Sequence, residues 1–246
     1  LERGRAAALS KAMLDRLALN PVRIAAMAQG LREVAAQADP AGRVLSRITR
    51  PNGLVIEKVS VPIGVIGIIY EARPNVTVDA AGICLKAGNA VILRGGKESF
   101  ESNMILAKVL NEAGMAAGMP DGAVQLVPFI DREAVSVLLK MSDCIDLIIP
   151  RGGEGLIRTV VEQSTIPVIK HYKGVCHLYA DAGCDIAMAV NVIENAKCQR
   201  PGTCNALETL LIDRAVAAAL IPPLLERLRA RGVEVRGDEA FRGYVP

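Results

Sequence analysis

The sequence has few aromatic residues and few histidines. Tryptophan is absent, aromatic residues make up 3% of the 246 residues, and there are 2 histidines. Because 51% of the residues are nonetheless hydrophobic, we expect a core of aliphatic side chains large enough for one or two globular domains. No apolar run approaches the roughly 20 residues that cross a bilayer as a helix, so we predict no association with a membrane.

An excess of charge of one sign is lacking as well. The 29 basic and 26 acidic residues leave a formal net charge of +3, and the two signs are mixed along the chain. A nucleic-acid-binding domain usually carries a basic patch or stripe. We therefore expect no nucleic-acid partner.

The 6 cysteines do not follow the spacing of a metal site or of a disulfide framework. No Cys-x-x-Cys pair occurs and no spaced histidines accompany them, so we predict reduced thiols and no metal site. With no signal peptide visible at the start, the simplest expectation is a cytoplasmic location. The chain begins without methionine and stops at "FRGYVP", from which we expect a piece of a longer protein.

The first forty residues have helical periodicity and lead into a predicted hairpin. Asn20 is a suitable helix cap, and Pro21 suits the first helical position after it. Residues 43–61 are β-like on both sides of Asn52-Gly53, a dipeptide typical of hairpin turns. Since an isolated hairpin is only marginally stable, we expect this one to pack on something, such as another subunit.

From Pro62 onward, short apolar strands alternate with helical segments, two of which we expect to end at Gly88 and Gly114. Such strands are typical of a parallel sheet covered by helices on both faces, a Rossmann-like α/β domain that binds ligands at the carboxyl ends of its strands. We assign this domain to residues 1–180. Residues 181–246 begin a second α/β pattern that stops before a domain is complete. The predicted strands are 64–71, 90–94, 123–127, 144–150, 167–170, 176–181, 205–212 and 233–237.

Two predicted loops at strand ends combine glycines with basic residues. Glycine lets the backbone approach a ligand closely, and a following helix N-terminus with Arg or Lys favours phosphate, so both loops are candidate sites for a dinucleotide. Tight turns between a strand and a helix would explain the same residues equally well. The loop residues are Arg94, Gly95, Gly96 and Lys97 in the first, and Arg151, Gly152 and Gly153 in the second.

Asn75 and Cys204 each allow a structural and a catalytic interpretation. Asn75 follows a proline and precedes a helix, so it could cap that helix or donate its amide to an oxyanion. Cys204 could be a small buried residue, since free cysteine is often buried. It also stands at a polar junction before a strand, four residues after Arg200, whose charge would favour a thiolate. Cys198 ends a helical pattern and is expected to face a neighbour.

Three segments together carry a resemblance to a known family. They are "VIGIIYEARPNVTVDAAGICLKAGNAVILRGGKES", "VIKHYKGVCHLYAD" and "NAKCQRPGTCNALETLL". The sequence resembles the glutamate-5-semialdehyde dehydrogenase (gamma-glutamyl phosphate reductase) family of the aldehyde dehydrogenase superfamily. The resemblance implies an α/β fold with a Rossmann-type cofactor domain, an oligomerisation hairpin at about 43–61 and a second catalytic α/β domain, here incomplete.

The resemblance also implies an activity in proline biosynthesis. It is the NADPH-dependent reduction of L-glutamyl 5-phosphate to L-glutamate 5-semialdehyde, with release of phosphate. Cys204 falls on the superfamily's nucleophile and would form a thioester, while Asn75 falls on its oxyanion-binding asparagine. The resemblance further suggests a homodimer or larger oligomer, and leaves open whether glutamate 5-kinase passes its unstable product directly to the enzyme.

Two departures from hydrolytic aldehyde dehydrogenases fit this resemblance. The segment matching their general-base glutamate is "VIKHYKGVCHLYAD", which contains no Glu and so would not activate water against a thioester. Lys97 falls where many NAD-dependent relatives have a ribose-binding Glu, and a cation there would favour the 2′-phosphate of NADPH. Arg200 would hold a substrate carboxylate or phosphate, or tune Cys204. The alternatives are an acylating enzyme with another acyl donor and a non-catalytic cofactor-binding or oligomerising fragment.

Overall fold

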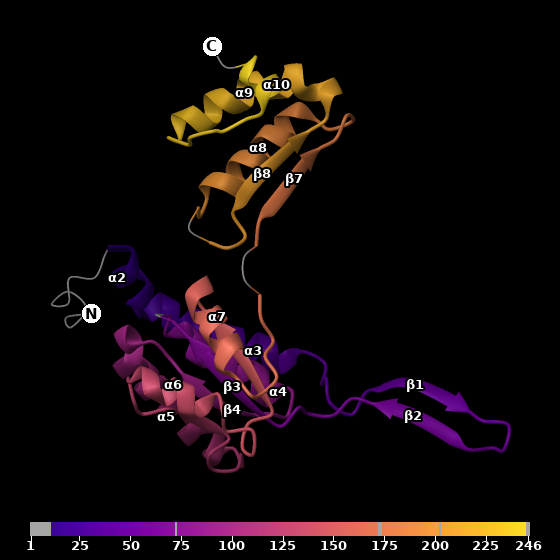
Figure 1. Cartoon of the computed structure of the whole chain (residues 1–246), viewed down its shortest axis with the longest axis vertical. Coiled ribbons are helices and arrows are strands. Elements are labelled where there is room, and N and C mark those ends of the chain that lie inside the picture. Colours follow the sequence, from indigo (N-terminus) through magenta and orange to yellow (C-terminus); the bar gives the residue numbers. More distant parts are fainter. Residues whose placement is uncertain (1–10, 72, 172–173, 202, 245–246) are drawn as a thin grey trace. The chain divides into compact units, whose positions relative to one another are not determined.

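The structure is a computed structural model that describes residues 11–71, 73–171, 174–201 and 203–244. The chain divides into two compact units, Leu1–Lys170 and His171–Pro246 (Figure 1), and each is described by itself. The boundary expected at 180/181 was therefore placed too late. Strand β7 (Cys176–Ala180) pairs with β8 (Leu207–Ile212), and this pairing makes β7 part of the second unit.

The first unit opens with the helices α2 (Lys11–Leu17) and α3 (Pro21–Ala36). The side chain of Asn20 accepts a hydrogen bond from the Arg23 backbone N–H at 2.8 Å, and Pro21 is the first helical residue. The predicted cap is thus confirmed. It satisfies one of the N–H groups that have no partner within the helix.

The predicted hairpin is present as β1 (Val44–Thr49) and β2 (Val55–Val59), which pair antiparallel. Gly53 closes the turn with φ 84°, a conformation that glycine adopts without strain. Every residue of both strands is exposed, and Figure 1 shows the purple hairpin extending away from the rest of the unit. The hairpin therefore presents both faces and both outer edges to solvent within this chain.

A parallel four-stranded sheet forms the core of the first unit, as the alternating pattern predicts. Its buried strands pack under the helices through aliphatic residues such as Ile68, Val91 and Leu93. The strands are β3 (Val65–Tyr70), β4 (Ala90–Arg94), β5 (Val124–Leu126) and β6 (Leu147–Arg151). The connecting helices are α4 (Asn75–Lys86), η1 (Lys97–Ser99), α5 (Phe100–Ala116), α6 (Arg132–Leu138) and α7 (Glu154–Gln163).

In the strand order β5-β4-β3-β6, β4 and β5 are added on one side of β3 and β6 on the other, so the direction of the connections reverses between β3 and β6. In open α/β sheets this is the place where ligands bind, beside the carboxyl ends of the strands. The segment expected as a strand at 167–170 contributes one parallel bridge, between Ile148 and Val168. Gly88 follows α4 with φ 75°, as predicted, but α5 continues through Gly114, and the left-handed glycine after it is Gly118.

The second unit holds the parallel pair β7 and β8 with helices α8 (Ile186–Cys198), α9 (Arg214–Ala230) and α10 (Glu239–Arg242). Residues of α8, β8 and α9 share one apolar core, which includes Ile193 and Leu220. Residues 233–237, expected as a strand, form no strand. Among the described residues, no helix is long and apolar enough to cross a membrane.

Candidate functional site

The loop after β4 is residues 94–97, here called the β4 loop, and Arg94 stabilises it from within. The Arg94 guanidinium donates to the carbonyl oxygens of Ile130 at 2.9 Å, Asp131 at 3.1 Å and Gly95 at 3.2 Å. Burial lowers the pKa of the Arg94 guanidinium, although an arginine so engaged stays protonated. The side chain expected to bind the cofactor therefore holds the segment that follows β5.

Gly95 of the β4 loop packs closely against buried side chains of the first unit, and Gly96 accepts hydrogen bonds. A Cβ on Gly95 would overlap the amide nitrogen of Asn103 and lie 3.1 Å from the Tyr70 ring. The Gly96 carbonyl accepts from the Ser99 N–H at 3.2 Å and from the Ser99 hydroxyl at 3.3 Å. Lys97 then begins η1 with an exposed side chain. The result is a tight turn that presents a cation at the end of a central strand.

The loop after β6, residues 151–154, is here called the β6 loop, and it already binds a carboxylate of this chain. The Gly153 N–H donates to Glu71 Oε2 at 3.1 Å, and the Glu71 N–H donates to the Arg151 carbonyl at 3.2 Å. A Cβ on Gly152 would lie 2.7 Å from the Glu71 carboxyl carbon. Gly152 thus makes room for Glu71 and Gly153 binds it, at the N-terminus of α7, where the helix dipole favours an anion.

Asn75 is the first residue of α4, and the cap position before it is Pro74, which makes no side-chain capping bond. The interpretation of Asn75 as a helix cap is therefore wrong. Its exposed amide donates instead to Asp79 Oδ2 at 2.9 Å, one turn along the helix. An asparagine amide carries two hydrogens, so one is left for a further acceptor.

Cys204 lies in the loop between α8 and β8 and is exposed. This exposure contradicts its interpretation as a small buried residue. A turn precedes it, in which the Thr203 N–H and hydroxyl donate to the Arg200 carbonyl at 3.1 and 2.8 Å. Its own carbonyl lies 3.4 Å from the Cys176 Sγ, within reach of that thiol as a donor. Cys198, in contrast, packs half-buried on the core of its unit, as expected.

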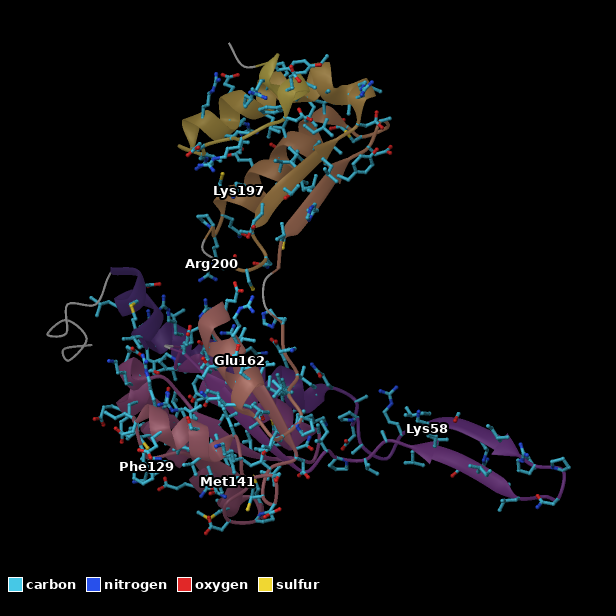
Figure 2. The ribbon with its side chains drawn as sticks, in the orientation of Figure 1. Lys58, Phe129, Met141, Glu162, Lys197 and Arg200 are labelled. Carbon is cyan, nitrogen blue, oxygen red and sulfur yellow. The ribbon has the colours of Figure 1, made fainter. Side chains whose placement is uncertain are left out.

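Lys197 is a residue that the sequence analysis missed. Its ammonium donates to the Leu207 carbonyl at 2.9 Å and so ties the end of α8 to the start of β8, across the loop that carries Cys204. Figure 2 labels Lys197 at the end of α8 and Arg200 in the turn beyond it. A lysine in the last turn of a helix resembles an ordinary dipole partner, so no sequence signal marks this contact.

The predicted site residues are thus distributed over both units. The β4 loop, the β6 loop and Asn75 follow three strands of one sheet in the first unit, and Glu71 joins β3 to the β6 loop. Cys204 and Arg200 belong to the second unit, where Lys197 and Cys176 hold their loop.

The sequence matches the model of the aldehyde dehydrogenase family over residues 11–241. The chain belongs to the aldehyde dehydrogenase family. It is 58% identical over 243 residues to the gamma-glutamyl phosphate reductase of Moorella thermoacetica, which covers 99% of this chain and 58% of that protein. The chain therefore spans less than two thirds of the length of this relative.

Solved structures show the same fold. The crystal structure of gamma-glutamyl phosphate reductase from Thermotoga maritima superposes with a TM-score of 0.92 at 43% identity, over 100% of this chain and 59% of that one. An engineered glycolyl-CoA reductase with bound NADP+ matches with a TM-score of 0.64 at 20% identity, over 88% of this chain and 55% of its own, which shows the fold alone. The expected aldehyde dehydrogenase-like α/β architecture with a parallel sheet is confirmed.

Proposed function

We propose that the protein containing this chain reduces L-glutamyl 5-phosphate to L-glutamate 5-semialdehyde with release of phosphate. The observation that carries the proposal is the exposed thiol of Cys204, at the position that the resemblance gives to the family's nucleophile. The bond from Lys197 to the Leu207 carbonyl connects the two ends of its loop. The sequence identity to a gamma-glutamyl phosphate reductase supports this substrate and a place in proline biosynthesis.

The Cys204 thiolate would attack the acyl carbon of the substrate. The S–C bond would form first and give a tetrahedral oxyanion. Its collapse would break the C–O bond to phosphate, which leaves with the electron pair, so that a thioester remains on Cys204. The oxyanion of the tetrahedral stage needs fixed donors. We assign this role to the Cys204 N–H. The resemblance gives Asn75 the role of the family's oxyanion-binding asparagine, and its amide keeps one hydrogen beyond its bond to Asp79.

Members of this family use a nicotinamide dinucleotide, which when bound supplies the hydride that takes the thioester to the aldehyde level. Collapse of the oxyanion that results would re-form the C=O bond and break the C–S bond toward sulfur, so that the aldehyde leaves and the Cys204 thiolate is restored. A thioester that waits for hydride must be protected from water. The absence of a glutamate in the segment 168–181 is consistent with this requirement.

The β4 loop fits the cofactor better than the β6 loop does. Lys97 is exposed at the start of η1, and its charge suits the 2′-phosphate of NADPH. In the β6 loop the Gly153 amide already donates to Glu71, so a cofactor phosphate there would compete with a resident carboxylate. We therefore propose NADPH as the preferred cofactor and Lys97 as its 2′-phosphate contact, with Arg94 acting on the loop rather than on the cofactor.

We also propose that the hairpin joins two or more copies of the chain. Its cross-strand pair Ile48 and Ile56 is 54% and 48% exposed, and Val44 opposite Val59 is 54% and 42% exposed. Apolar residues paired on a projecting hairpin are typical of a surface that becomes buried on association. Hydrogen-bonding groups at its outer edges are free to extend a sheet of a partner copy.

The test is the reverse reaction, measured as the phosphate-dependent reduction of NADP with glutamate 5-semialdehyde. It should be run with this chain and with a protein extended to the length of the Moorella relative, with NAD in parallel. Cys204→Ser should abolish the rate, whereas Cys198→Ser, a matched change six residues away, should leave most of it. A rate supported by coenzyme A in place of phosphate would overturn the proposed substrate, and an unchanged rate in Cys204→Ser would overturn the mechanism.

A further inference from the structure

A chain of buried polar side chains runs through the core of the first unit beneath the β4 loop. Its members Tyr70, Thr77, Asn103 and Ser99 are 1%, 0%, 1% and 2% exposed. The oxygen atoms of Tyr70 and Thr77 lie 2.7 Å apart, the Thr77 hydroxyl donates to Asn103 Oδ1 at 3.2 Å, and the Asn103 amide donates to Ser99 Oγ at 3.0 Å. We call these four residues the buried polar chain.

With the Asn103 amide oriented as it is in the structure, the hydrogens of the buried polar chain run in one direction. A hydroxyl has one hydrogen to donate. Thr77 gives its hydrogen to Asn103, so the Tyr70 hydroxyl must be the donor to Thr77. Ser99 accepts from Asn103 and donates to the Gly96 carbonyl at 3.3 Å. Burial raises the pKa of Tyr70 to about 12, so Tyr70 keeps its proton at neutral pH.

The buried polar chain connects the first turn of α4 with the β4 loop. Thr77 lies two residues after Asn75, and the chain of hydrogen bonds ends on the carbonyl of Gly96, directly before Lys97. Gly95 packs against the same Asn103 amide, which leaves no room for a side chain. The position of Lys97 at the end of the sheet is therefore fixed by side chains that are inaccessible to solvent. Two of them, Tyr70 and Thr77, are remote from Lys97 in the sequence.

Apolar residues could fill a purely structural role without the need for a hydrogen-bond partner for every buried polar atom. Buried polar groups stabilise a fold only when each has a partner, and apolar residues of the same shape are often as stable. Their value lies in specifying one geometry. Here the geometry that they specify is that of the loop bearing the proposed 2′-phosphate contact.

We propose that Thr77, Asn103 and Ser99 are positioning residues for cofactor selection, which act by fixing the β4 loop so that Lys97 meets the 2′-phosphate of NADPH. This inference rests on the proposed function and extends it to residues that do not touch the cofactor. NADH lacks the 2′-phosphate, so its binding depends less on where Lys97 stands. Disrupting the buried polar chain should therefore weaken the binding of NADPH more than that of NADH.

The experiment compares the dissociation constants of NADPH and NADH by isothermal titration calorimetry on the 246-residue chain. Thr77→Val replaces the hydroxyl by a methyl group of similar size, and Thr77→Ser keeps the hydroxyl. We expect Thr77→Val to raise the Kd of NADPH about tenfold and that of NADH less than threefold, on the scale of one lost hydrogen bond to a charged group. Thr77→Ser should restore the native ratio.

A buried apolar variant separates positioning from stability. Ile145→Val removes one methylene from a fully buried residue of the same unit and should lower the melting temperature without changing the NADPH to NADH ratio. An unchanged ratio in folded Thr77→Val would overturn the inference. Should Thr77→Val fail to fold, Ser99→Ala, which removes the bond to Gly96, makes the same test. A native chain that binds neither cofactor, or binds both equally, would overturn the proposed cofactor and the inference with it.

Discussion

The β4 loop and the β6 loop begin with the same three residues and are used in opposite ways. Each reads Arg-Gly-Gly at the end of a parallel strand, followed by Lys97 in one case and Glu154 in the other. In the β4 loop the arginine turns inward to backbone carbonyls and the lysine is exposed. In the β6 loop the glycines hold Glu71, and Glu154 pairs with Arg158 at 2.7 Å.

The difference shows that the surroundings of a glycine-rich turn decide its chemistry. A backbone N–H at a helix N-terminus attracts any anion, including one supplied by the same chain. The β6 loop meets the end of β3, from which Glu71 reaches it, whereas the β4 loop lies over the uncharged buried polar chain. The N-terminus of α7 therefore already holds an anion of this chain, whereas the β4 loop exposes the charge of Lys97 to solvent.

Adding one methyl group to each loop region should give the largest contrast. Gly95→Ala places a Cβ on the Asn103 amide, and we expect a loss of about 1–3 kcal/mol in the free energy of unfolding. Gly155→Ala, in α7 beside the β6 loop, meets nothing within 4 Å and should instead gain about 0.5–1 kcal/mol. Denaturation by urea measures both, and equal effects of the two variants would contradict the packing difference.

Reversing the charge of the residue after each glycine pair should change the Kd of NADPH much more in the β4 loop than in the β6 loop. Lys97→Glu should raise the Kd of NADPH at least tenfold, because one charge-assisted contact contributes about 1.5–3 kcal/mol. Glu154→Lys removes an exposed pair with Arg158 and an acidic residue from the first turn of α7, neither of which involves Lys97, and should change this Kd less than threefold. Fluorescence titration with NADPH provides the measurement, and a larger effect at Glu154 would exchange the roles assigned to the two loops.

Alkaline pH should destabilise the region beneath the β4 loop through Tyr70. Its pKa is raised from 10.0 to about 12 by burial, so the unfolded chain releases this proton first and the folded state loses stability as the pH rises from 10 to 12. Below pH 10 this contribution is fully present. Tyr70→Phe should flatten the decline of stability in this interval. Part of the decline should remain, because burial also raises the pKa of Cys84 from 9.0 to about 11.

Glu71→Gln should give the smallest effect and bears on the β6 loop alone. The variant keeps an acceptor for the Gly153 N–H but removes the negative charge from the N-terminus of α7, at a cost of about 0.3–1 kcal/mol. The cost should shrink at high salt, which screens exposed charges. Thermal melts at two salt concentrations test this, and a loss that is independent of salt would mean that Glu71 acts through packing.

Local signals predicted those parts of the fold that depend on neighbouring residues. The cap at Asn20, the turn at Gly53 and the left-handed Gly88 each follow from residues close in the sequence, and the alternation of strands and helices predicted the parallel sheet. The errors arose where distant residues decide. The chain passes from one unit to the next before β7 because β7 needs β8 as a partner, about thirty residues further on.

The candidate site shows the same limit at the level of single residues. The resemblance marked Cys204 and Lys97, both of which are exposed, but it gave no reason to notice Glu71 or Asn103. Glu71 binds a backbone amide 82 positions away, and Thr77 meets Asn103 across 26 positions. Contacts of this kind leave no spacing pattern in a single sequence, because the sheet brings the partners together only after it forms.

The one-way order of the buried polar chain has a consequence for spectroscopy in solution. Hydroxyl protons usually exchange with water too quickly to be observed by NMR. The Thr77 hydroxyl is fully buried, and its single proton is committed to Asn103 while its oxygen accepts from Tyr70. This proton should exchange only when the packing of α4 against β3 and α5 opens, and its resonance would then report directly on how often the core of the first unit opens.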